Sequence, residues 1–257
     1  MLILLPPSEG KTRPEDGPPL DLDALSFARL NPVREQLLRS LVKLSSGNPR
    51  RAAEVLGLGP TQAGAIAVNA VLPDEPAARA DTVYTGVLFT ALDPASLDDV
   101  ARRRADESLA IASALFGLVR PGDLIPAYRL SGTVSLPRLG PVAGRWRTPL
   151  PRVMAEAVGD GLLVDLRSGT YTALGKPPVE LAERTATMRV LHEHNGQRKV
   201  VSHFNKATKG RIVRGLLEAG AEPRTVDELQ ATLADLGWTV ERAGTRLDVV
   251  VDEVATS

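Results

Sequence analysis

The first segment whose residue types could do chemistry is the loop at residues 6–12, directly after an apolar stretch at residues 1–5. It ends in Gly-Lys-Thr, the triplet that closes the phosphate-binding loop of nucleoside triphosphatases. That loop also needs an earlier glycine and a run of backbone N–H donors, but a leucine stands at the glycine position and two prolines lack the N–H. We therefore expect no triphosphate-binding loop. The segment predicts either a site for one anion or a surface turn with a solvated lysine, and its candidate ligands are Ser8, Lys11 and Thr12.

A second segment places two glycines, Gly57 and Gly59, between two short stretches of helical spacing. Such glycines allow a tight turn in left-handed backbone conformations. The helix that follows would open with free N–H groups and the positive end of its dipole, which together bind phosphate without reading sequence. This pattern is typical of a helix-hairpin-helix element and equally of an ordinary helix pair with a glycine cap. Arg50 and Arg51 nearby add the positive charge that a nucleic acid would need.

A third segment is the long proline-punctuated loop at residues 117–130, which carries Arg120, Tyr128 and Arg129. A loop of this length in a compact domain usually serves a site. Arginine can hold a phosphate through two hydrogen bonds, and tyrosine can stack on a base. A buried Arg–Asp pair that fixes the loop would explain the same residues. Two further polar residues, Tyr84 and Ser168, stand where predicted strands end.

Positive charge is concentrated at residues 198–214, although the chain has 31 Lys+Arg, 31 Asp+Glu and a formal net charge of zero. If this segment is helical, Lys206, Lys209 and Arg214 fall along one face. Solvated helix faces usually alternate in sign, and this one does not. The cluster therefore favours an anionic partner, while the zero net charge argues against a strong field over the whole molecule.

Other chemistries find little support in the sequence. The absence of cysteine excludes disulfides, thiolate catalysis and cysteine-ligated metals. His192 and His194 share one face of a predicted strand and have no third histidine nearby in sequence, which is more typical of surface residues than of a metal site. No Gly-x-Ser-x-Gly nucleophile elbow is present. We expect no metal, no cofactor and no recognised catalytic motif.

The elements that must position these residues follow from the hydrophobic pattern. Apolar residues at helical spacing predict helices at residues 33–44, 50–56, 61–70, 96–114, 207–217 and 226–236. Short apolar runs, and a hairpin signal at residues 195–196, predict strands at residues 1–5, 82–89, 162–166, 187–194, 197–203 and 239–251. Because strands and helices do not alternate regularly, we expect an α+β fold. It would be a single compact mixed-sheet domain over residues 1–257, with a helical insert at residues 33–80.

The chain carries no signal for a membrane or for export. No apolar run approaches the length of a membrane span. The first residues lack the basic region and the cleavage site of a signal peptide. We expect a soluble cytoplasmic protein with no membrane contact.

The blocks at residues 3–12, 84–86, 115–130, 168–171 and 204–214 stand in the order seen in the peroxide stress protein YaaA family. The chain resembles that family over nearly its whole length. The most specific block is Gly-Leu-x-Arg-Pro-x-Asp-Leu-x-x-x-Tyr-Arg-Leu at residues 117–130, whereas Phe116 and Phe204 stand where tyrosine is common in the family. The resemblance implies an unusual YaaA-like α+β fold in a cytosolic protein that protects cells from oxidative stress by limiting free iron. It also implies DNA binding through a helix-hairpin-helix and a positively charged cleft.

By this resemblance the hairpin would be formed by Gly57 and Gly59, and the residues expected in the cleft are Lys11, Tyr84, Arg120, Arg129, Lys206, Lys209 and Arg214. The expected partner is duplex DNA, bound without sequence preference. The alternative is an enzyme that acts on a nucleobase, a nucleotide or another small anionic substrate in the same cleft. A third, weaker hypothesis is an iron-binding protein, although the residues offer no direct ligand set.

Overall fold

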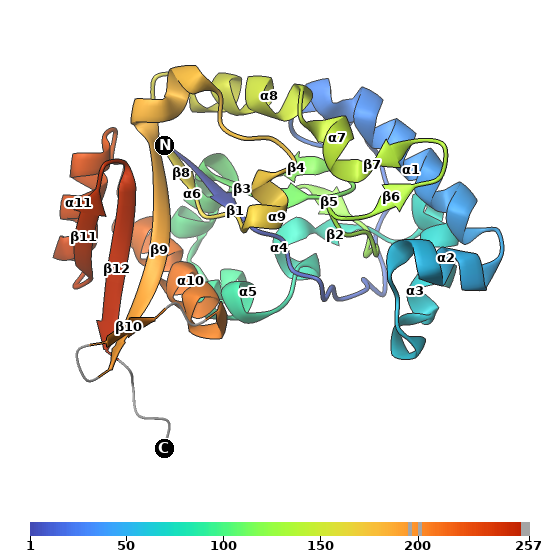
Figure 1. Ribbon diagram of the computed structural model, residues 1–257, viewed down its shortest axis with the longest axis horizontal. Coiled ribbons are helices and arrows are strands. Elements are labelled where there is room, and N and C mark those ends of the chain that lie inside the picture. Colours follow the sequence, from blue (N-terminus) through green and yellow to red (C-terminus); the bar gives the residue numbers. More distant parts are fainter. Residues whose placement is uncertain (195–196, 200–201, 253–257) are drawn as a thin grey trace.

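The computed structural model describes residues 1–194, 197–199 and 202–252. Its centre is a mixed sheet of eight strands, which are β1 (Leu2–Leu5), β3 (Leu109–Ser113), β4 (Gly117–Val119), β8 (Leu163–Asp165), β9 (Thr185–His194), β10 (Gln197–Lys199), β11 (Thr239–Ala243) and β12 (Arg246–Asp252). The strands lie in the order β11-β12-β9-β8-β1-β3-β4, and β10 pairs with β9 (Figure 1). This order puts the first strand of the chain in the middle of the sheet.

The middle of the sheet is parallel. β1 pairs in parallel with β3 and with β8, β8 pairs in parallel with β9, and β9 pairs in parallel with β12. Every residue of β1, β3 and β8 is buried. Parallel strands covered on both faces read as continuous apolar runs, so the strand predictions at residues 1–5 and 162–166 are confirmed. The antiparallel pairs β9–β10 and β11–β12 are also confirmed, while the turn at residues 195–196 lies outside the described residues. The strand predicted at residues 197–203 is too long, because β10 ends at Lys199 and α10 begins at Ser202.

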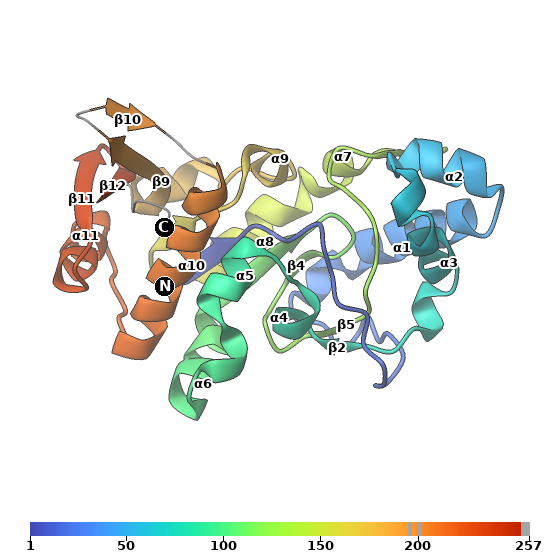
Figure 2. The same ribbon diagram turned by 90° about the horizontal axis from the view of Figure 1, so that it is seen from below.

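The described residues form helices of very different lengths, some of which cover the two faces of the sheet. They are α1 (Asn31–Ser45), α2 (Pro49–Leu56), α3 (Gly64–Ala70), α4 (Ala80–Val83), α5 (Val87–Leu92), α6 (Asp99–Ser108), α7 (Val142–Trp146), α8 (Pro149–Val158), α9 (Gly169–Thr172), α10 (Ser202–Ala219) and α11 (Val226–Asp235). Figures 1 and 2 show α5, α6 and α10 on one side of the sheet and α8 on the other. Two short ladders lie beside the main sheet, β2 (Ala78–Arg79) with β5 (Leu124–Ile125) and β6 (Ser135–Leu136) with β7 (Gly140–Pro141).

The contact between α5 and α10 depends on one glycine. A Cβ added at Gly210 would lie 2.4 Å from the Leu88 carbonyl oxygen, closer than real atoms approach. Only glycine lets the two helix backbones come this close. The helix prediction at residues 207–217 is confirmed, and its glycine has a packing role that the sequence did not show.

Two sequence predictions are wrong in the same way. Residues 82–89 are helical at both ends, in α4 and α5, with Gly86 at a φ of 103° between them, and they contain no strand. The helix predicted at residues 96–114 ends at Ser108, and the rest of that segment is β3. Short apolar runs fit a buried strand and a buried helical turn equally well, so their periodicity does not separate the two.

The fold class is confirmed in its coarser form, as a mixed α/β protein with a mixed sheet. We expected no regular alternation of strands and helices, yet β1, β3, β8 and β9 form a parallel core whose successive members are linked through helical segments. Parallel neighbours cannot be joined by a tight turn and need such crossovers. The core is therefore closer to an α/β sheet than the prediction allowed.

The predicted insert at residues 33–80 contains α1, α2 and α3, and β2 at its end pairs with β5. α2 ends at Gly57, whose φ of 64° is left-handed as its glycine predicts. Gly59 is extended and precedes a 3₁₀ turn at Pro60–Gln62 before the seven-residue α3, so the single helix predicted at residues 61–70 is split. A helix-hairpin-helix remains a prediction for this segment.

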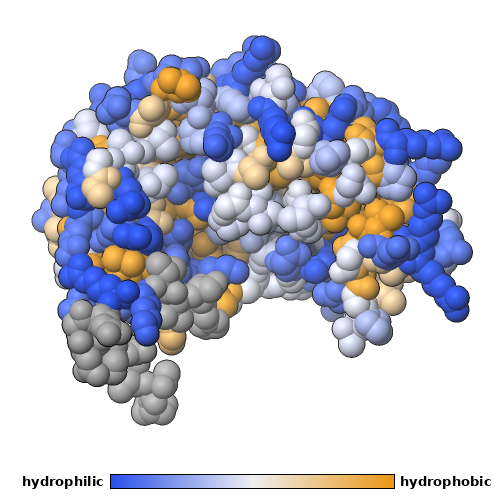
Figure 3. Space-filling view, viewed as in Figure 1, coloured by the Kyte–Doolittle hydropathy of each residue, from blue (hydrophilic) through white to orange (hydrophobic). Residues whose placement is uncertain are grey.

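The surface in the view of Figure 3 is hydrophilic over most of its area, with a hydrophobic area on the side where α1 and α2 lie. The segment that contains α2 and α3 projects from the body of the molecule in the same view. Among the residues that the structure describes, no helix combines the length and the apolar character needed to cross a bilayer.

Candidate anion-binding site at the carboxyl end of the sheet

The candidate site lies where the parallel strands β1, β3 and β8 end. The loop at residues 6–12 follows β1, Ser113 ends β3, and Asp165 ends β8. Ligands of open α/β sheets bind in the crevice outside the carboxyl ends of the strands, where the connections leave in opposite directions. β1 lies between the parallel strands β8 and β3, so its carboxyl end is at the middle of this edge.

The loop after β1 is held in place by residues 83–85. Ser8 Oγ donates to the Gly10 carbonyl at 2.6 Å and accepts from the Thr85 N–H at 2.9 Å. Lys11 forms an isolated antiparallel bridge with Tyr84, and the Thr12 N–H donates to the Val83 carbonyl at 2.9 Å. Hydrogen bonds to residues 83–85 therefore hold this loop in one conformation, and they fix the direction of the Lys11 side chain.

Lys11 carries its amine into an aromatic environment. Nζ donates to the Ser8 carbonyl at 3.0 Å and lies 5.2 Å from the ring centre of Tyr84 and 4.3 Å from that of Tyr128. The loss of water around the amine lowers its pKa to about 8, the Glu9 carboxylate opposes this shift, and Arg129 adds to it. Ring faces attract an ammonium, but they replace only part of the lost hydration. Near neutral pH this lysine can therefore exist in both charge states.

Three hydroxyl groups form a buried chain beneath Lys11. The Tyr84 and Tyr128 hydroxyls lie 2.9 Å apart, and Tyr128 lies 2.7 Å from Ser113 Oγ. Ser113 Oγ also accepts from the Phe116 N–H at 2.9 Å, and the Phe116 ring packs edge-on against Tyr128. Burial raises the pKa of Tyr84 to about 12 and that of Tyr128 well above its usual value. Both hydroxyls are consequently neutral donors at physiological pH.

Arg129 reaches the same place from the loop after β5. The buried side chain of Asn69 holds its backbone, because Asn69 donates to the Arg129 carbonyl at 2.8 Å and accepts from its N–H at 2.9 Å. The guanidinium donates to the Glu9 carbonyl at 2.9 Å and lies 3.2 Å from the Glu9 carboxylate. Asn69 belongs to α3, so the helical segment itself positions this arginine.

Of these groups, Lys11, Tyr128 and Arg129 line one pocket of about 300 Å³, whereas Tyr84 and Ser113 lie behind its lining. One wall comes from the loop after β1, the second from the loop that carries Tyr128 and Arg129, and the third from the segment that follows the Gly57–Gly59 turn. The lining residues are Glu9, Lys11, Arg13, Thr61, Gln62, Gly64, Ala65, Val68, Ala127, Tyr128 and Arg129. We call this the carboxyl-end pocket. It brings cationic groups from two distant parts of the sequence beside the residues that follow the Gly57–Gly59 turn, although neither of these glycines lines it.

Charged groups at the end of β8 are largely neutralised. Arg167, whose side chain is fully buried, makes two hydrogen bonds of 2.8 Å to the Asp165 carboxylate. Lys209 donates to the Leu166 carbonyl at 3.4 Å, and burial lowers its pKa while Asp165 opposes the shift. Ser168 precedes α9, which carries the buried Tyr171. This part of the edge is polar but offers little free charge.

The other predicted residues lie apart from the carboxyl-end pocket. Arg120 donates to the Leu109 carbonyl at 2.8 Å and lies over the Phe27 ring. Arg214 binds the carbonyls of Leu92 and Asp93, each at 3.0 Å. Both arginines therefore bind backbone carbonyls, and Arg214 also lines a separate pocket of about 720 Å³. Lys206 and Thr12 are exposed.

His192 is buried rather than exposed and packs against Phe204 with ring centres 5.0 Å apart, which corrects our interpretation of it as a surface residue. The side chain of His194 lies outside the described residues. In the described ranges no group of three His, Asp or Glu side chains could hold a metal ion.

Sequence reasoning missed four residues that shape the pocket, namely Glu9, Gln62, Asn69 and Ser113. Glu9 and Gln62 stand inside motifs that were recognised, so their neighbours were a usable signal. Asn69 and Ser113 interrupt apolar runs without any motif. Their roles depend on partners 60 and 15 residues away along the chain, which a local pattern does not reveal.

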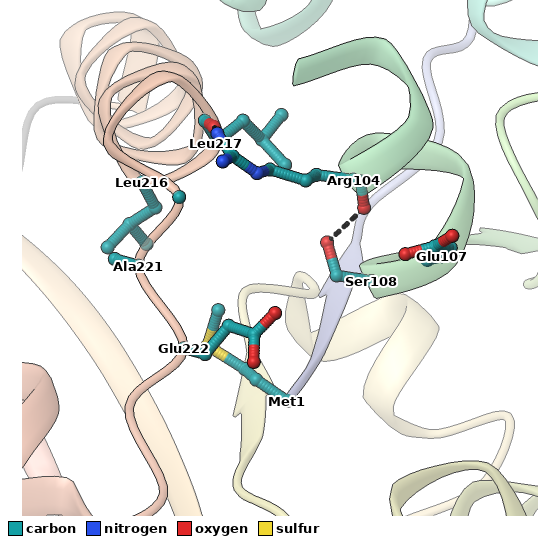
Figure 4. Close-up of a pocket in the computed structure, with 9 residues that line it drawn as sticks. Met1, Arg104, Glu107, Ser108, Leu216, Leu217, Ala221 and Glu222 are labelled. Carbon is teal, nitrogen blue, oxygen red and sulfur yellow. Dashed lines mark hydrogen bonds between the residues drawn. The ribbon is translucent and has the colours of Figure 1, made fainter. Parts of the chain in front are cut away.

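A second pocket, of about 210 Å³, lies at the opposite end of the strands, and we call it the amino-end pocket. It is lined by Met1, Arg104, Glu107, Ser108, Leu216, Leu217, Gly220, Ala221 and Glu222 (Figure 4). The Arg104 side chain extends toward the last turn of α10 and donates to the Leu217 carbonyl at 2.9 Å. This arginine adds a charged donor to the helix-end carbonyls of Leu217 and Glu218, and the Leu217 carbonyl also accepts from the Gly220 N–H at 3.2 Å.

Comparisons with known proteins cover nearly the whole chain. The family model described as peroxide stress protein YaaA matches residues 1–243. A UPF0246 protein of Streptomyces coelicolor is 51% identical over 261 residues, covering 99% of this chain and 100% of that protein. A UPF0246 protein of Corynebacterium efficiens is 43% identical over 94% of this chain and 95% of its own length. One of Shewanella woodyi is 31% identical over 85% of this chain and 86% of its own length.

Proposed function

Because this chain belongs to the peroxide stress protein YaaA family, whose name supports a stress-related role, we propose that it acts in peroxide defence by binding nucleic acid at the carboxyl-end pocket. The contacts would be to phosphate groups and independent of base sequence. The proposed ligand is duplex DNA, and the proposed compartment is the cytoplasm. A link to iron homeostasis would be indirect.

The observation that carries this proposal is the meeting of two distant segments. The residues that follow the Gly57–Gly59 turn line the same pocket as Lys11 and Arg129. The start of the helix that follows this turn was predicted to contact phosphate through its free N–H groups, and the arginine through its guanidinium. Their placement on one surface is what a phosphate backbone that crosses the pocket would need.

Contacts of this kind would position the nucleic acid without reading it. Phosphate contacts carry no sequence information, and their strength falls steeply with salt. The chain has no net charge to supply a general attraction. Binding would therefore depend on a few local cations, of which Arg129 is the best placed, because its acidic neighbour Glu9 is half-exposed and can be displaced by phosphate.

The test is duplex binding by Arg129→Ala over a range of salt concentrations, with Arg103→Ala as the matched control. Arg103 is an exposed arginine of α6, away from the carboxyl-end pocket. Loss of one phosphate contact should lower the slope of log affinity against log salt by about 0.9 and should weaken binding equally for unrelated sequences. Unchanged slope and affinity in Arg129→Ala, or an equal loss in Arg103→Ala, would contradict the proposal.

A second candidate function is an enzyme that acts on a nucleobase, a nucleotide or another small anion. It is favoured by the buried chain of Tyr84, Tyr128 and Ser113, which a groove for a phosphate backbone does not need. Polar groups gathered from distant segments around a small pocket are typical of active sites. A nucleotide-sized molecule that co-purifies with the protein, detected by mass spectrometry, would favour this candidate.

A further inference from the structure

We infer that Lys11 is a nucleophile that captures an aldehyde carried next to a phosphate group, by forming an imine with it. The phosphate part of this inference rests on the proposed function, since Arg129 is the group that would hold the phosphate. The imine part rests on the surroundings of Lys11 alone. The two parts can therefore fail separately.

The position of Lys11 differs from that of a structural lysine. Its amine has one protein hydrogen bond in the described structure, to the Ser8 carbonyl, and its other close neighbours are the faces of two tyrosine rings. No ion pair of 4 Å or less joins it to a carboxylate among the described residues. The nearest acid, Glu9, is paired with Arg129. An amine with so little compensation for its charge is disposed to lose its proton.

Imine formation needs that neutral amine. Lysine nucleophiles are activated by an apolar pocket or by a second cation nearby, and Lys11 has both, in the tyrosine rings and in Arg129. With a pKa of about 8, roughly a quarter of the amines are neutral at pH 7.5, against about one in a thousand for an ordinary lysine. The geometry and the charge state thus favour the same reaction.

The step balances without any further reagent. The Lys11 nitrogen attacks the carbonyl carbon, and a proton moves from nitrogen to the carbonyl oxygen to give a carbinolamine. Loss of that hydroxyl as water then leaves a carbon–nitrogen double bond, so that an amine and an aldehyde become an imine and water. No oxidation or reduction occurs. The pocket opens to solvent at the exposed Glu9, and water can carry the protons.

The neighbour of Lys11 in the pocket, Arg129, indicates that the aldehyde should carry a phosphate group. Arg129 shares the pocket and can make two hydrogen bonds to a phosphate. An aldehyde next to a phosphate has two sources with the same chemistry: a free phosphorylated aldehyde, and the open-chain sugar of a nucleic-acid site that has lost its base. A pocket of about 300 Å³ has room for one sugar phosphate but not for stacked base pairs. A strand would have to present the sugar turned out of the duplex.

The test is reductive trapping with borohydride, read by intact mass and by peptide mapping. One arm uses glyceraldehyde 3-phosphate, and the other uses a duplex oligonucleotide with a single abasic site. We expect an adduct on Lys11, and at least a 100-fold loss of the trapping rate in Lys11→Arg, which keeps a positive charge but forms no imine. Lys43→Arg, at an exposed lysine of α1, serves as the control and should trap within twofold of the wild type.

Each outcome decides the inference. Trapping on Lys11 with one probe supports it and identifies the source, and trapping with both supports it with a phosphorylated aldehyde as the shared feature. Adducts that persist in Lys11→Arg overturn it. An absence of adducts while salt-dependent duplex binding persists also overturns it, and leaves the proposed function intact. An adduct on Lys11 with no duplex binding supports the nucleophile and removes the nucleic-acid proposal.

Discussion

The carboxyl-end and amino-end pockets lie at opposite ends of the same parallel strands, and each contains a long cationic side chain. In the amino-end pocket, Arg104 binds the Leu217 and Glu218 carbonyls at the end of α10. In the carboxyl-end pocket, Lys11 binds one carbonyl and faces two tyrosine rings. Arg104 thus adds hydrogen bonds at a helix end, whereas the positive charge of Lys11 is poorly compensated after the loss of its water.

This difference indicates which pocket is built for function. A cation that saturates helix-end carbonyls stabilises the fold and also interacts well with the helix dipole. A desolvated amine makes the fold less stable, and such departures from local consistency are expected at functional sites. From this comparison we infer a structural role for the amino-end pocket and propose a chemical role for the carboxyl-end pocket. Three measurements test these two roles.

We expect the largest effect, on the free energy of unfolding, from a substitution in the amino-end pocket. Arg104→Ala leaves the last carbonyls of α10 without their charged donor, and we expect it to lower the free energy of unfolding by about 2–3 kcal/mol. Duplex binding by the folded variant should not change. Chemical denaturation checks the first point, and the neighbouring exposed Arg103→Ala should stay within about 0.5 kcal/mol of the wild type. If Arg104→Ala kept the stability of the wild type but bound duplex DNA more weakly, the amino-end pocket would be the functional one.

An intermediate effect is expected in the pH dependence of trapping at Lys11. The groups that face its amine are Glu9, Arg129, Tyr84 and Tyr128. The pKa of about 8 implies a rise of about tenfold in the neutral amine between pH 7 and pH 9, followed by a plateau, whereas an ordinary lysine would rise about 100-fold. Trapping rates at a fixed aldehyde concentration measure this. A 100-fold rise would show that the amine is not desolvated.

We expect the smallest effect from Lys11→Met, as an increase in the free energy of unfolding. The pKa of Lys11 is lower in the folded protein than the usual 10.5, so the unfolded chain binds more protons between about pH 8 and pH 10.5 and stability rises with pH across that window. At pH 7 the lysine is destabilising. Lys11→Met removes the charge, and we expect it to raise the free energy of unfolding by about 1 kcal/mol at pH 7 and to lose this advantage above pH 10.5. A less stable Lys11→Met at pH 7 would show that the charge is well compensated.

The sequence predicted long elements better than short ones. The helix at residues 33–44 and the helix at residues 226–236 appear as α1 and α11, with ends shifted by a few residues. Residues 82–89 and 109–114 were assigned to the wrong type of element. The long helices repeat their apolar spacing over several turns, while the short segments contain one turn or one strand and leave the period undefined.

The local sequence by itself determined the left-handed backbone at Gly57 and the absence of a phosphate-binding loop after β1. It also identified Lys11 and Arg129 as cationic residues in loops. Only the tertiary structure decided what these cations do. Parallel pairing of β1 with β3 placed Ser113 near Lys11, and the Lys11–Tyr84 bridge and the hydroxyl contacts of Tyr128 brought in the two tyrosines. Asn69 fixed the backbone of Arg129 beside them. The charge state of an amine depends on how much water its neighbours exclude, and those neighbours come from segments that meet only when the chain folds.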